Sequence, residues 1–351
     1  MSLSEFLKQK KSLSGFKNEL DPDIIGLDLG IIRQEHINGM QIADHCRVDH
    51  MAKNFAWMRG NQNCFTGWAN SGKTQFTLFM FSIKSKVDNW KWCIWSPEMR
   101  RANFVDGKVK VHYNRLAYEL MATTSGKTPF EHVSKKFKVP FMTIEEKEFW
   151  FEWIRDHFIF LEPVERKIDN IYDTLHRVYD NYGVDGFLID PYKNIDVEAN
   201  VRDDHHLHRA FAKYQDLAVR TNTVMNWIAH PKSGVSRVAT KNGVETAVPC
   251  NQYMLAGGAA WENSMDGIYS IHRPNILEDA TDPAVEFYNL KERDQLLVAE
   301  KGIVKDIMFD VKTRRYIFNG YSPFGFNETN NDVFKGSNLD FFENETKDTP
   351  F

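Results

Sequence analysis

The residues best suited to chemistry lie in one run, from Gly67 to Thr74, with the sequence Gly-Trp-Ala-Asn-Ser-Gly-Lys-Thr. This run, called the phosphate loop below, fits G-x-x-x-x-G-K-[ST], a pattern whose backbone N–H groups surround nucleotide phosphates. In such loops the lysine, here Lys73, reaches the β- and γ-phosphates, and the hydroxyl of Thr74 binds Mg²⁺. The other expected phosphate-binding residues are Gly67, Asn70, Ser71 and Gly72. The sequence therefore predicts a site for a nucleoside triphosphate with Mg²⁺.

The segments on either side of the loop have the character that phosphate binding requires. Residues 63–66 predict a short buried strand, and residues 74–84 predict a helix whose N-terminus faces the phosphates. A second Ser-Gly-Lys-Thr run at 125–128 has Met121 where the first glycine belongs, and Pro129 follows it directly. We interpret this second run as a polar connection between helices.

Further candidates lie where predicted strands end, which is where a parallel sheet gathers its functional groups. Asp190 ends the apolar strand 184–190 and is the candidate second Mg²⁺ ligand. Glu98 follows the strand 92–95 and is the candidate general base that orients an attacking water. His230 ends a later strand and is the candidate sensor of the γ-phosphate. The respective alternatives are a strand-end turn, a residue of a first helical turn and a histidine without a task.

Three other groups have simpler interpretations on their residues alone. Lys291 and Arg293 follow a predicted strand and are typical of a solvated hairpin turn. The histidines within 205–208 lack an evident fourth ligand, so they favour a solvated helix start over a metal site. The aromatic block 149–153 favours core or subunit packing over base stacking.

Composition limits the class of protein. The 351 residues, 42% of them hydrophobic, are enough for one large packed domain. A net charge of −4 excludes an overall basic coat for nucleic acid but permits a local basic channel. The four cysteines are scattered, which argues against a disulfide framework and indicates a reducing compartment. The longest apolar run, 76–81, is too short to span a bilayer. With no signal peptide evident, we expect a cytoplasmic protein without a membrane partner.

The order of predicted elements indicates an α/β fold with a mainly parallel sheet and helices on both faces. Strands and helices alternate from residue 91 to 229, a polar loop follows at 232–252, and the later short strands are expected to be an antiparallel extension. The expected division of the chain is an amphipathic arm at 1–22, a linker at 23–54, an ATPase domain at 55–322 and an acidic, disordered tail at 323–351.

In this order, the pieces resemble the RecA-like helicase module of hexameric replicative helicases. The bacterial DnaB type is similar, and the phage primase-helicase and mitochondrial Twinkle type is more so. The matching segments, over roughly residues 55–320, are the phosphate loop with the two residues before it, 96–99 with the catalytic glutamate, 186–191 with the Mg²⁺ site, and 229–231 with the γ-phosphate sensor. The resemblance implies ATP, or dTTP, as the nucleotide, Mg²⁺ as cofactor, and a ring of six subunits with sites between neighbours.

The resemblance also assigns residues that their types alone do not. Lys291 and Arg293 match a pair inserted into the neighbouring subunit's site, which makes Arg293 a candidate arginine finger. Phe309 falls where relatives place an aromatic ring against the nucleotide base. The segment 255–260, with Gly257 and Gly258, is similar to one that contributes to DNA-binding loops. The basic candidates for single-stranded DNA in the preceding loop are Lys232, Arg237 and Lys241.

These expectations add up to an NTP-driven replicative DNA helicase that translocates on single-stranded DNA and unwinds duplexes. No primase region precedes the module, so priming would belong to another protein. The acidic tail, ending in Phe351, resembles tails with which phage helicases engage their DNA polymerase, and the alternative is a solubilising terminus. The rival functions are a RecA-type recombinase or DNA-packaging motor, and a non-enzymatic ATP-binding loader or scaffold of the replication machinery.

Overall fold

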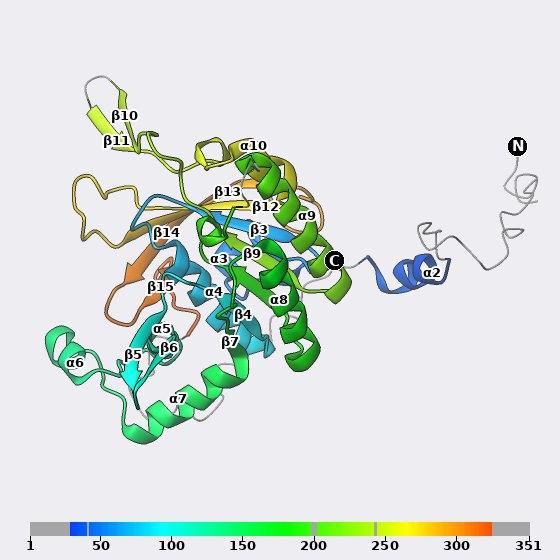
Figure 1. The fold of residues 1–351 in the computed structure, drawn as a ribbon. Coiled ribbons are helices and arrows are strands. Elements are labelled where there is room, and N and C mark those ends of the chain that lie inside the picture. The colour runs from blue at the N-terminus through cyan, green and yellow to red at the C-terminus, as the bar shows by residue number, and fades with distance from the viewer. Residues whose placement is uncertain (1–28, 41, 198–201, 242–243, 325–351) are drawn as a thin grey trace, which may run out of the picture. The chain divides into compact units, whose positions relative to one another are not determined.

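The computed structural model describes residues 29–40, 42–197, 202–241 and 244–324, and one mixed sheet forms their core. The strands of that sheet are β3 (Gln62–Thr66), β4 (Trp92–Trp95), β7 (Phe158–Phe160), β8 (Gly186–Ile189), β9 (Val224–Ile228), β12 (Gly267–His272), β13 (Ala284–Glu292), β14 (Gly302–Asp310) and β15 (Arg315–Phe318). Their order across the sheet is β15-β14-β13-β12-β3-β9-β8-β4-β7 (Figure 1). Neighbours from β12 to β7 pair in parallel, whereas β13, β14 and β15 are added antiparallel.

This architecture confirms the expected fold class, with two corrections. The strand β12 was expected in an antiparallel extension, but it pairs in parallel with β3 and antiparallel with β13. It therefore joins the two parts of the sheet. The polar loop expected at 232–252 contains a hairpin of β10 (Val238–Lys241) and β11 (Val244–Ala247), which stands apart from the sheet in Figure 1. Polar residues alternate along this hairpin without a buried face, so the sequence carries no strand signal there.

Helices cover both faces of the sheet. The covering helices are α4 (Lys73–Asp88), α5 (Asn114–Ser125), α7 (Ile144–His157), α8 (Ile168–Tyr182), α9 (Asp203–Thr221) and α10 (Gly258–Ser264). On one face Phe65 packs in a hydrophobic cluster with residues of α4, α5 and α7. On the other face its neighbour Cys64 packs with residues of α8, α9 and α10. Successive residues of β3 thus enter opposite cores, which explains why its sequence is a continuous buried run rather than an alternating one.

Local sequence signals set the helix ends as expected. Thr143 and Glu146 form the reciprocal hydrogen bonds of a capping box at the start of α7. Gly183 ends α8 in the left-handed conformation, with φ 62°. The run 125–128 joins α5 to α6 (Glu131–Phe137) and is the polar connection inferred from its sequence.

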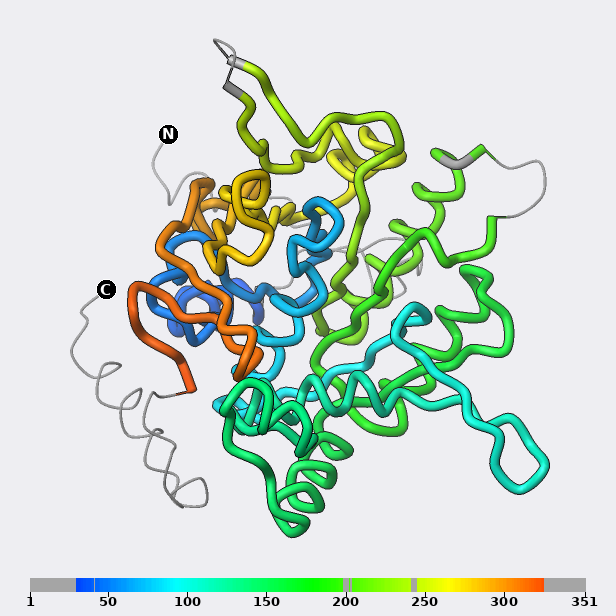
Figure 2. The backbone as a smooth tube through the Cα atoms, turned by 90° about the vertical axis from the view of Figure 1, so that its left-hand side faces the viewer, coloured from blue at the N-terminus to red at the C-terminus, as the bar shows by residue number. Residues whose placement is uncertain are grey.

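The remaining elements are short or isolated. They are α2 (Leu29–Asn38), β1 (Asp44–His45), α3 (Asp49–Ala52), β2 (Ala56–Trp57), β5 (Arg101–Val105), β6 (Lys108–His112), η2 (Tyr192–Asn194) and η3 (Gln252–Met254). The hairpin β5–β6, which the sequence analysis missed, stands away from the rest of its domain in Figure 2. Internal contacts divide the chain into residues 1–42, which contain α2, and residues 43–351. The amphipathic arm at 1–22 and the tail from residue 325 lie outside the described residues. Every described helix is too short or too polar to cross a membrane.

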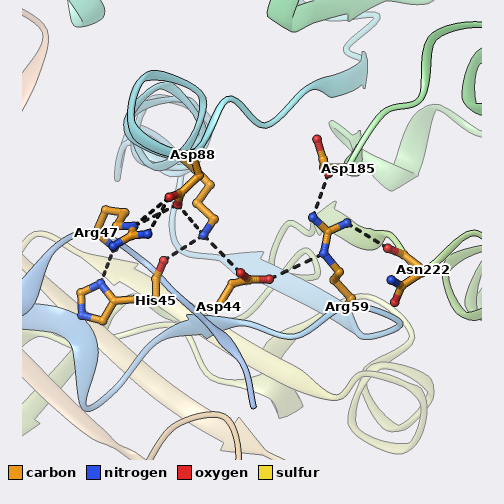
Figure 3. A network of polar contacts seen from close by, with 8 residues as sticks. Asp44, His45, Arg47, Arg59, Asp88, Asp185 and Asn222 are labelled. Atoms are coloured by element: carbon orange, nitrogen blue, oxygen red, sulfur yellow. Dashed lines mark hydrogen bonds and ion pairs between the residues drawn. The ribbon is translucent and has the colours of Figure 1, made fainter. Parts of the chain in front are cut away.

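Charged side chains tie the segment before β3 to the end of α4 and to the start of β8 (Figure 3). Asp88 accepts two hydrogen bonds from Arg47 and lies 2.6 Å from the buried ammonium group of Lys84. Arg59 bridges Asp44, at 3.6 Å, and Asp185, at 2.8 Å. Burial alone would raise the pKa of Asp88, but the hydrogen bonds from Arg47 and Lys84 outweigh it and lower that pKa.

The substitution Asp88→Asn tests this network. It leaves the buried Lys84 without its closest carboxylate, so the free energy of unfolding should fall by about 3 kcal/mol in urea titrations at neutral pH. Asp216→Asn breaks an exposed pair with Arg220 on α9 and should cost less than about 1 kcal/mol. Because the pKa of Asp88 is lowered, its contribution is present above pH 3.8 and is lost as the pH falls through the folded value. Equal losses for the two variants would contradict a stabilising role.

Candidate active site

The phosphate loop turns sharply between β3 and α4, and its shape requires residues without or with small side chains. Gly67 and Gly72 have φ of 149° and 90°, and Asn70 has φ of 63°. A Cβ atom on Gly67 would lie 2.4 Å from the carbonyl oxygen of Ile271, and one on Gly72 would lie 2.8 Å from the hydroxyl of Tyr316. Both positions therefore exclude any larger residue.

The cation and the hydroxyl of the loop are arranged for an anion. The Lys73 ammonium group is buried and donates to the carbonyl oxygens of Gly67 and Trp68, each at 3.0 Å. Burial lowers the pKa of Lys73, while the carboxylate of Asp190 acts against that shift. The hydroxyl of Ser71 is buried and has no hydrogen-bond partner among the described residues. An unpaired buried donor beside a curled-back lysine fits a phosphate group, whose oxygens would satisfy both.

Asp190 links three segments at the carboxyl edge of the sheet. Its Oδ2 accepts hydrogen bonds from the hydroxyls of Thr74, at 3.0 Å, and Ser96, at 3.1 Å. Complete burial raises the pKa of Asp190 to about 6. The described residues contain no cluster of three or more His, Cys, Asp or Glu that could hold a metal. One carboxylate and one hydroxyl still fit Mg²⁺, because this ion commonly takes one or two protein oxygens and completes its shell with water and substrate phosphates.

Two further candidates lie beside this cluster. Glu98, after β4, is partly exposed and pairs with Lys193 at 2.8 Å. His230, after β9, has its Nδ1 buried without a hydrogen-bond partner in the described part of the chain. Burial lowers the pKa of His230, and the nearby Lys73 and Lys193 lower it further, so the ring is neutral at pH 7. A neutral imidazole next to this site is a hydrogen-bond donor or acceptor rather than a charge.

A pocket of about 670 Å³ opens beside the loop. Asn70, Ser71 and Gly72 form one wall, and Phe309 of β14 forms part of another. The ring of Phe309 lies 4.9 Å from that of Tyr316, centroid to centroid. This volume and the aromatic wall suit a flat, apolar group next to the phosphate position.

Lys291 and Arg293 are not brought to the phosphate loop of their own chain. Glu292, between them, is level with Gly267 and Asn63, at the beginning of β3, whereas the loop follows its last residue, Thr66. Three strand residues correspond to about 10 Å. Arg293 instead pairs with Asp266 at 2.8 Å. Lys291 donates to the carbonyl oxygens of Met265, at 2.6 Å, and Glu262.

The DNA candidates fall in two adjacent loops. The backbone N–H of Lys232 donates to the carbonyl of Met254 at 2.8 Å, which brings the loop after β9 next to the segment before α10. Gly257 there has φ of 79°, and its Cβ would lie 2.1 Å from a methyl group of Leu207. Gly258 begins α10. Arg237 is exposed near β10, and nothing is described of the side chain of Lys241 at the end of that strand.

Several residues at the site were missed from the sequence. Ser96 and Lys193 follow the two strands that deliver Glu98 and Asp190, and that position was the available signal. Gln75, Arg273 and Tyr316 come from distant segments and line the pocket, for which the sequence carries no comparable signal.

Comparisons with known proteins bear on the whole module. No protein-family model matches the chain. A Twinkle homolog protein, chloroplastic/mitochondrial, of Arabidopsis thaliana is 23% identical over 222 residues, which are 61% of this chain and 28% of that protein. The matched part of this chain thus spans little more than a quarter of that relative's length.

Two solved structures share the fold. One is the ATPase domain of a helicase, with a TM-score of 0.64 at 14% identity, over 84% of this chain and 99% of that one. A DnaB-like replicative helicase, described with its interactions with primase, has a TM-score of 0.59 at 15% identity, over 84% and 67%. The RecA-like fold and the similarity to a Twinkle-type protein, both inferred from the sequence, are confirmed.

The carboxyl group between Lys291 and Arg293 gives a test of this edge of the sheet. Glu292 is 4% exposed, and its Oε2 accepts a hydrogen bond from the Tyr269 hydroxyl at 2.9 Å. Its Oε1 has no hydrogen-bond partner among the described residues. Burial raises the pKa of Glu292 from 4.5 to about 7.

Stability should therefore decrease with rising pH in a defined window. The folded chain binds the Glu292 proton more tightly than the unfolded chain, so its contribution is complete below pH 4.5 and is lost as the pH rises through about 7. Urea titrations between pH 4.5 and 8 should show this decline in wild type, and Glu292→Gln should flatten it. A variant with the same pH slope as wild type would contradict the assignment.

Proposed function

We propose that this chain is the NTP-hydrolysing subunit of a ring-shaped replicative DNA helicase. The observation that carries the proposal is the placement of its charged groups on opposite edges of one sheet. Lys73, Glu98 and Asp190 lie at the carboxyl edge, whereas Arg293 lies at the amino edge, level with the start of β3. A site that needs an arginine beside the phosphates would then be completed by a second copy of the chain.

At the carboxyl edge, this chain's residues would bind and orient an NTP such as ATP or dTTP. Lys73 would exchange its two carbonyl acceptors for phosphate oxygens, and the backbone of Gly67–Gly72 would donate to the same group. Thr74 and Asp190 would hold Mg²⁺, which when bound neutralises phosphate charge. Phe309 would contact the base.

Glu98 would accept a proton from the attacking water and orient it. The carboxylate is now held by Lys193, so that pair must open or shift for the base to act. His230 would form a hydrogen bond with the γ-phosphate and report its loss to the loop at Lys232. Lys291 and Arg293 of a neighbouring subunit would stabilise the charge that develops on the transferred phosphoryl group.

Head-to-tail packing of one surface on a different one closes into a ring, and six subunits are the number that the family resemblance implies. The loops around 232–258 would follow single-stranded DNA mainly through its phosphates, which makes binding sensitive to salt. A recombinase or packaging motor would use the same core. The similarity to a Twinkle-type protein and to a DnaB-like helicase favours unwinding.

Unwinding is the direct test. Wild-type chain with MgATP should separate a forked DNA that has a free 5′ single-stranded tail, and Lys73→Ala should not. Glu98→Gln should bind nucleotide normally but hydrolyse it about 100-fold more slowly, since a positioned base contributes a factor of that order or more. DNA-stimulated hydrolysis without unwinding would favour the recombinase or motor, and absence of hydrolysis would favour the loader or scaffold.

Mixing inactive variants tests whether sites are shared. Lys73→Ala and Arg293→Ala chains should each be inactive, but a 1:1 mixture should recover hydrolysis. About one quarter of the interfaces would then combine an intact loop with an intact arginine, as random head-to-tail assembly requires.

A matched control uses two lesions from the same edge. Lys73→Ala mixed with Glu98→Gln should recover nothing, because no interface regains both groups. Equal recovery in the two mixtures, or none in either, would rule out a site completed by Arg293 of the neighbour.

A further inference from the structure

A second pocket, of about 500 Å³, lies apart from the phosphate loop. The hairpin β5–β6, α5, α6 and the turn between β14 and β15 form its walls. It combines cationic and aromatic side chains, and these are Arg101, Arg115, Lys312, Arg314, Tyr118, Phe130 and Phe137. Glu119 is the carboxylate in its lining. Such a lining suits an anionic ligand that carries aromatic rings.

The cationic charge of this pocket is only partly neutralised. Arg314 pairs with Glu119 at 3.3 Å. Arg115 and Lys312 have no ion-pair partner within the described ranges. His112 accepts a hydrogen bond at Nδ1 from the backbone of Asn114 at 3.3 Å, which places the proton of a neutral ring on Nε2. That Nε2 is buried and has no hydrogen-bond partner in the described part of the chain.

The last described residue, Phe324, lies close to this pocket. Its ring lies 4.8 Å from the guanidinium carbon of Arg315. Arg315 in turn donates to the carbonyl oxygens of Thr123 and Thr124 in α5, at 2.9 and 2.8 Å. Ala122, in the same helical turn, lines the pocket. The chain therefore continues beyond residue 324 from a point about one helical turn from the pocket wall.

The remaining sequence complements the pocket in charge and in ring content. Residues 325–351 contain six acidic and two basic side chains and five phenylalanines. The run 340–343, Asp-Phe-Phe-Glu, places two carboxylates around two rings. This run begins sixteen residues after Phe324, since 340 − 324 = 16. An extended chain of that length spans about 50 Å, so the run can reach the pocket without strain.

We propose that the chain's own acidic tail docks in this pocket through residues 340–343. Its two carboxylates pair with Arg115 and Lys312, and its two rings pack against Tyr118, Phe130 and Phe137. Covalent attachment gives the tail a local concentration near the millimolar range, so a weak contact is enough to keep it bound. The tail thus competes with any acidic partner for this pocket. Val311 lines both this pocket and the one beside the phosphate loop, so the docked tail borders the candidate nucleotide site.

Photo-crosslinking in the full-length chain tests the proposal. With Phe342 replaced by p-benzoylphenylalanine, irradiation should link residue 342 to peptides from 101–137 or 311–314, as mapped by mass spectrometry. The charge reversal Arg115→Glu with Lys312→Glu should lower this yield about fivefold or more. Lys108→Glu with Lys110→Glu makes the same change in charge on the exposed hairpin outside the pocket lining, and should keep the yield within about twofold.

Two further arms keep the test decisive. Raising the salt from about 0.05 to 1 M should lower the yield in the chain with an intact pocket, which removes any dependence on the folding of the charge-reversed variant. Equal yields for the pocket and hairpin variants, or links to other regions, would overturn the proposal. So would loss of the links on adding ADP to a Lys73→Ala chain, since that would assign the pocket to a free nucleotide. None of these readouts depends on NTP hydrolysis or DNA unwinding.

Discussion

The two hydrogen bonds to the buried carboxyl group of Asp190 are the interaction on which the candidate site depends. Through them β8, the turn after β4 and the first turn of α4 meet at one oxygen atom. Each of these segments also carries a group of the proposed chemistry. Thr74 and Lys73 are on α4, Glu98 is in the turn, and Lys193 follows Asp190 itself. A carboxyl group buried this deeply is costly to ionise, and the two hydroxyls offset part of that cost.

The sheet supplies the geometry that this carboxyl group needs. Parallel strands put their carboxyl ends at one edge, and full coverage by helices keeps that edge rigid. The strand β12 extends the same order, because it pairs in parallel with β3 and antiparallel with β13. The phosphate loop and the Lys291–Arg293 segment are therefore fixed to neighbouring strands but at opposite edges. The same arrangement that separates them within one chain makes each accessible to a different neighbour.

Much of this was predictable because the relevant signals are local. The phosphate loop, the strand ending at Asp190, the capping box of Thr143 and the stop at Gly183 each depend on a few adjacent residues. The position of β12 was wrong because a short apolar strand carries no record of its partner. The hairpins β5–β6 and β10–β11 escaped detection because neither has a buried face. The Lys193 contact with Glu98 and the pocket wall at Phe309 join distant segments, so residue types alone did not reveal those contacts.

The isolated hairpin β5–β6 has a further consequence for how this domain tolerates change. Its strands pair only with each other among the described residues, and its turn at Asp106–Gly107 projects away from the sheet. Extra sequence at that turn would disturb no core packing, which is the usual requirement for a permissive insertion point. The hairpin begins three residues after Glu98. A fluorophore or small tag placed at its turn would therefore move with the segment that carries the proposed base, and would make rearrangements there visible in solution.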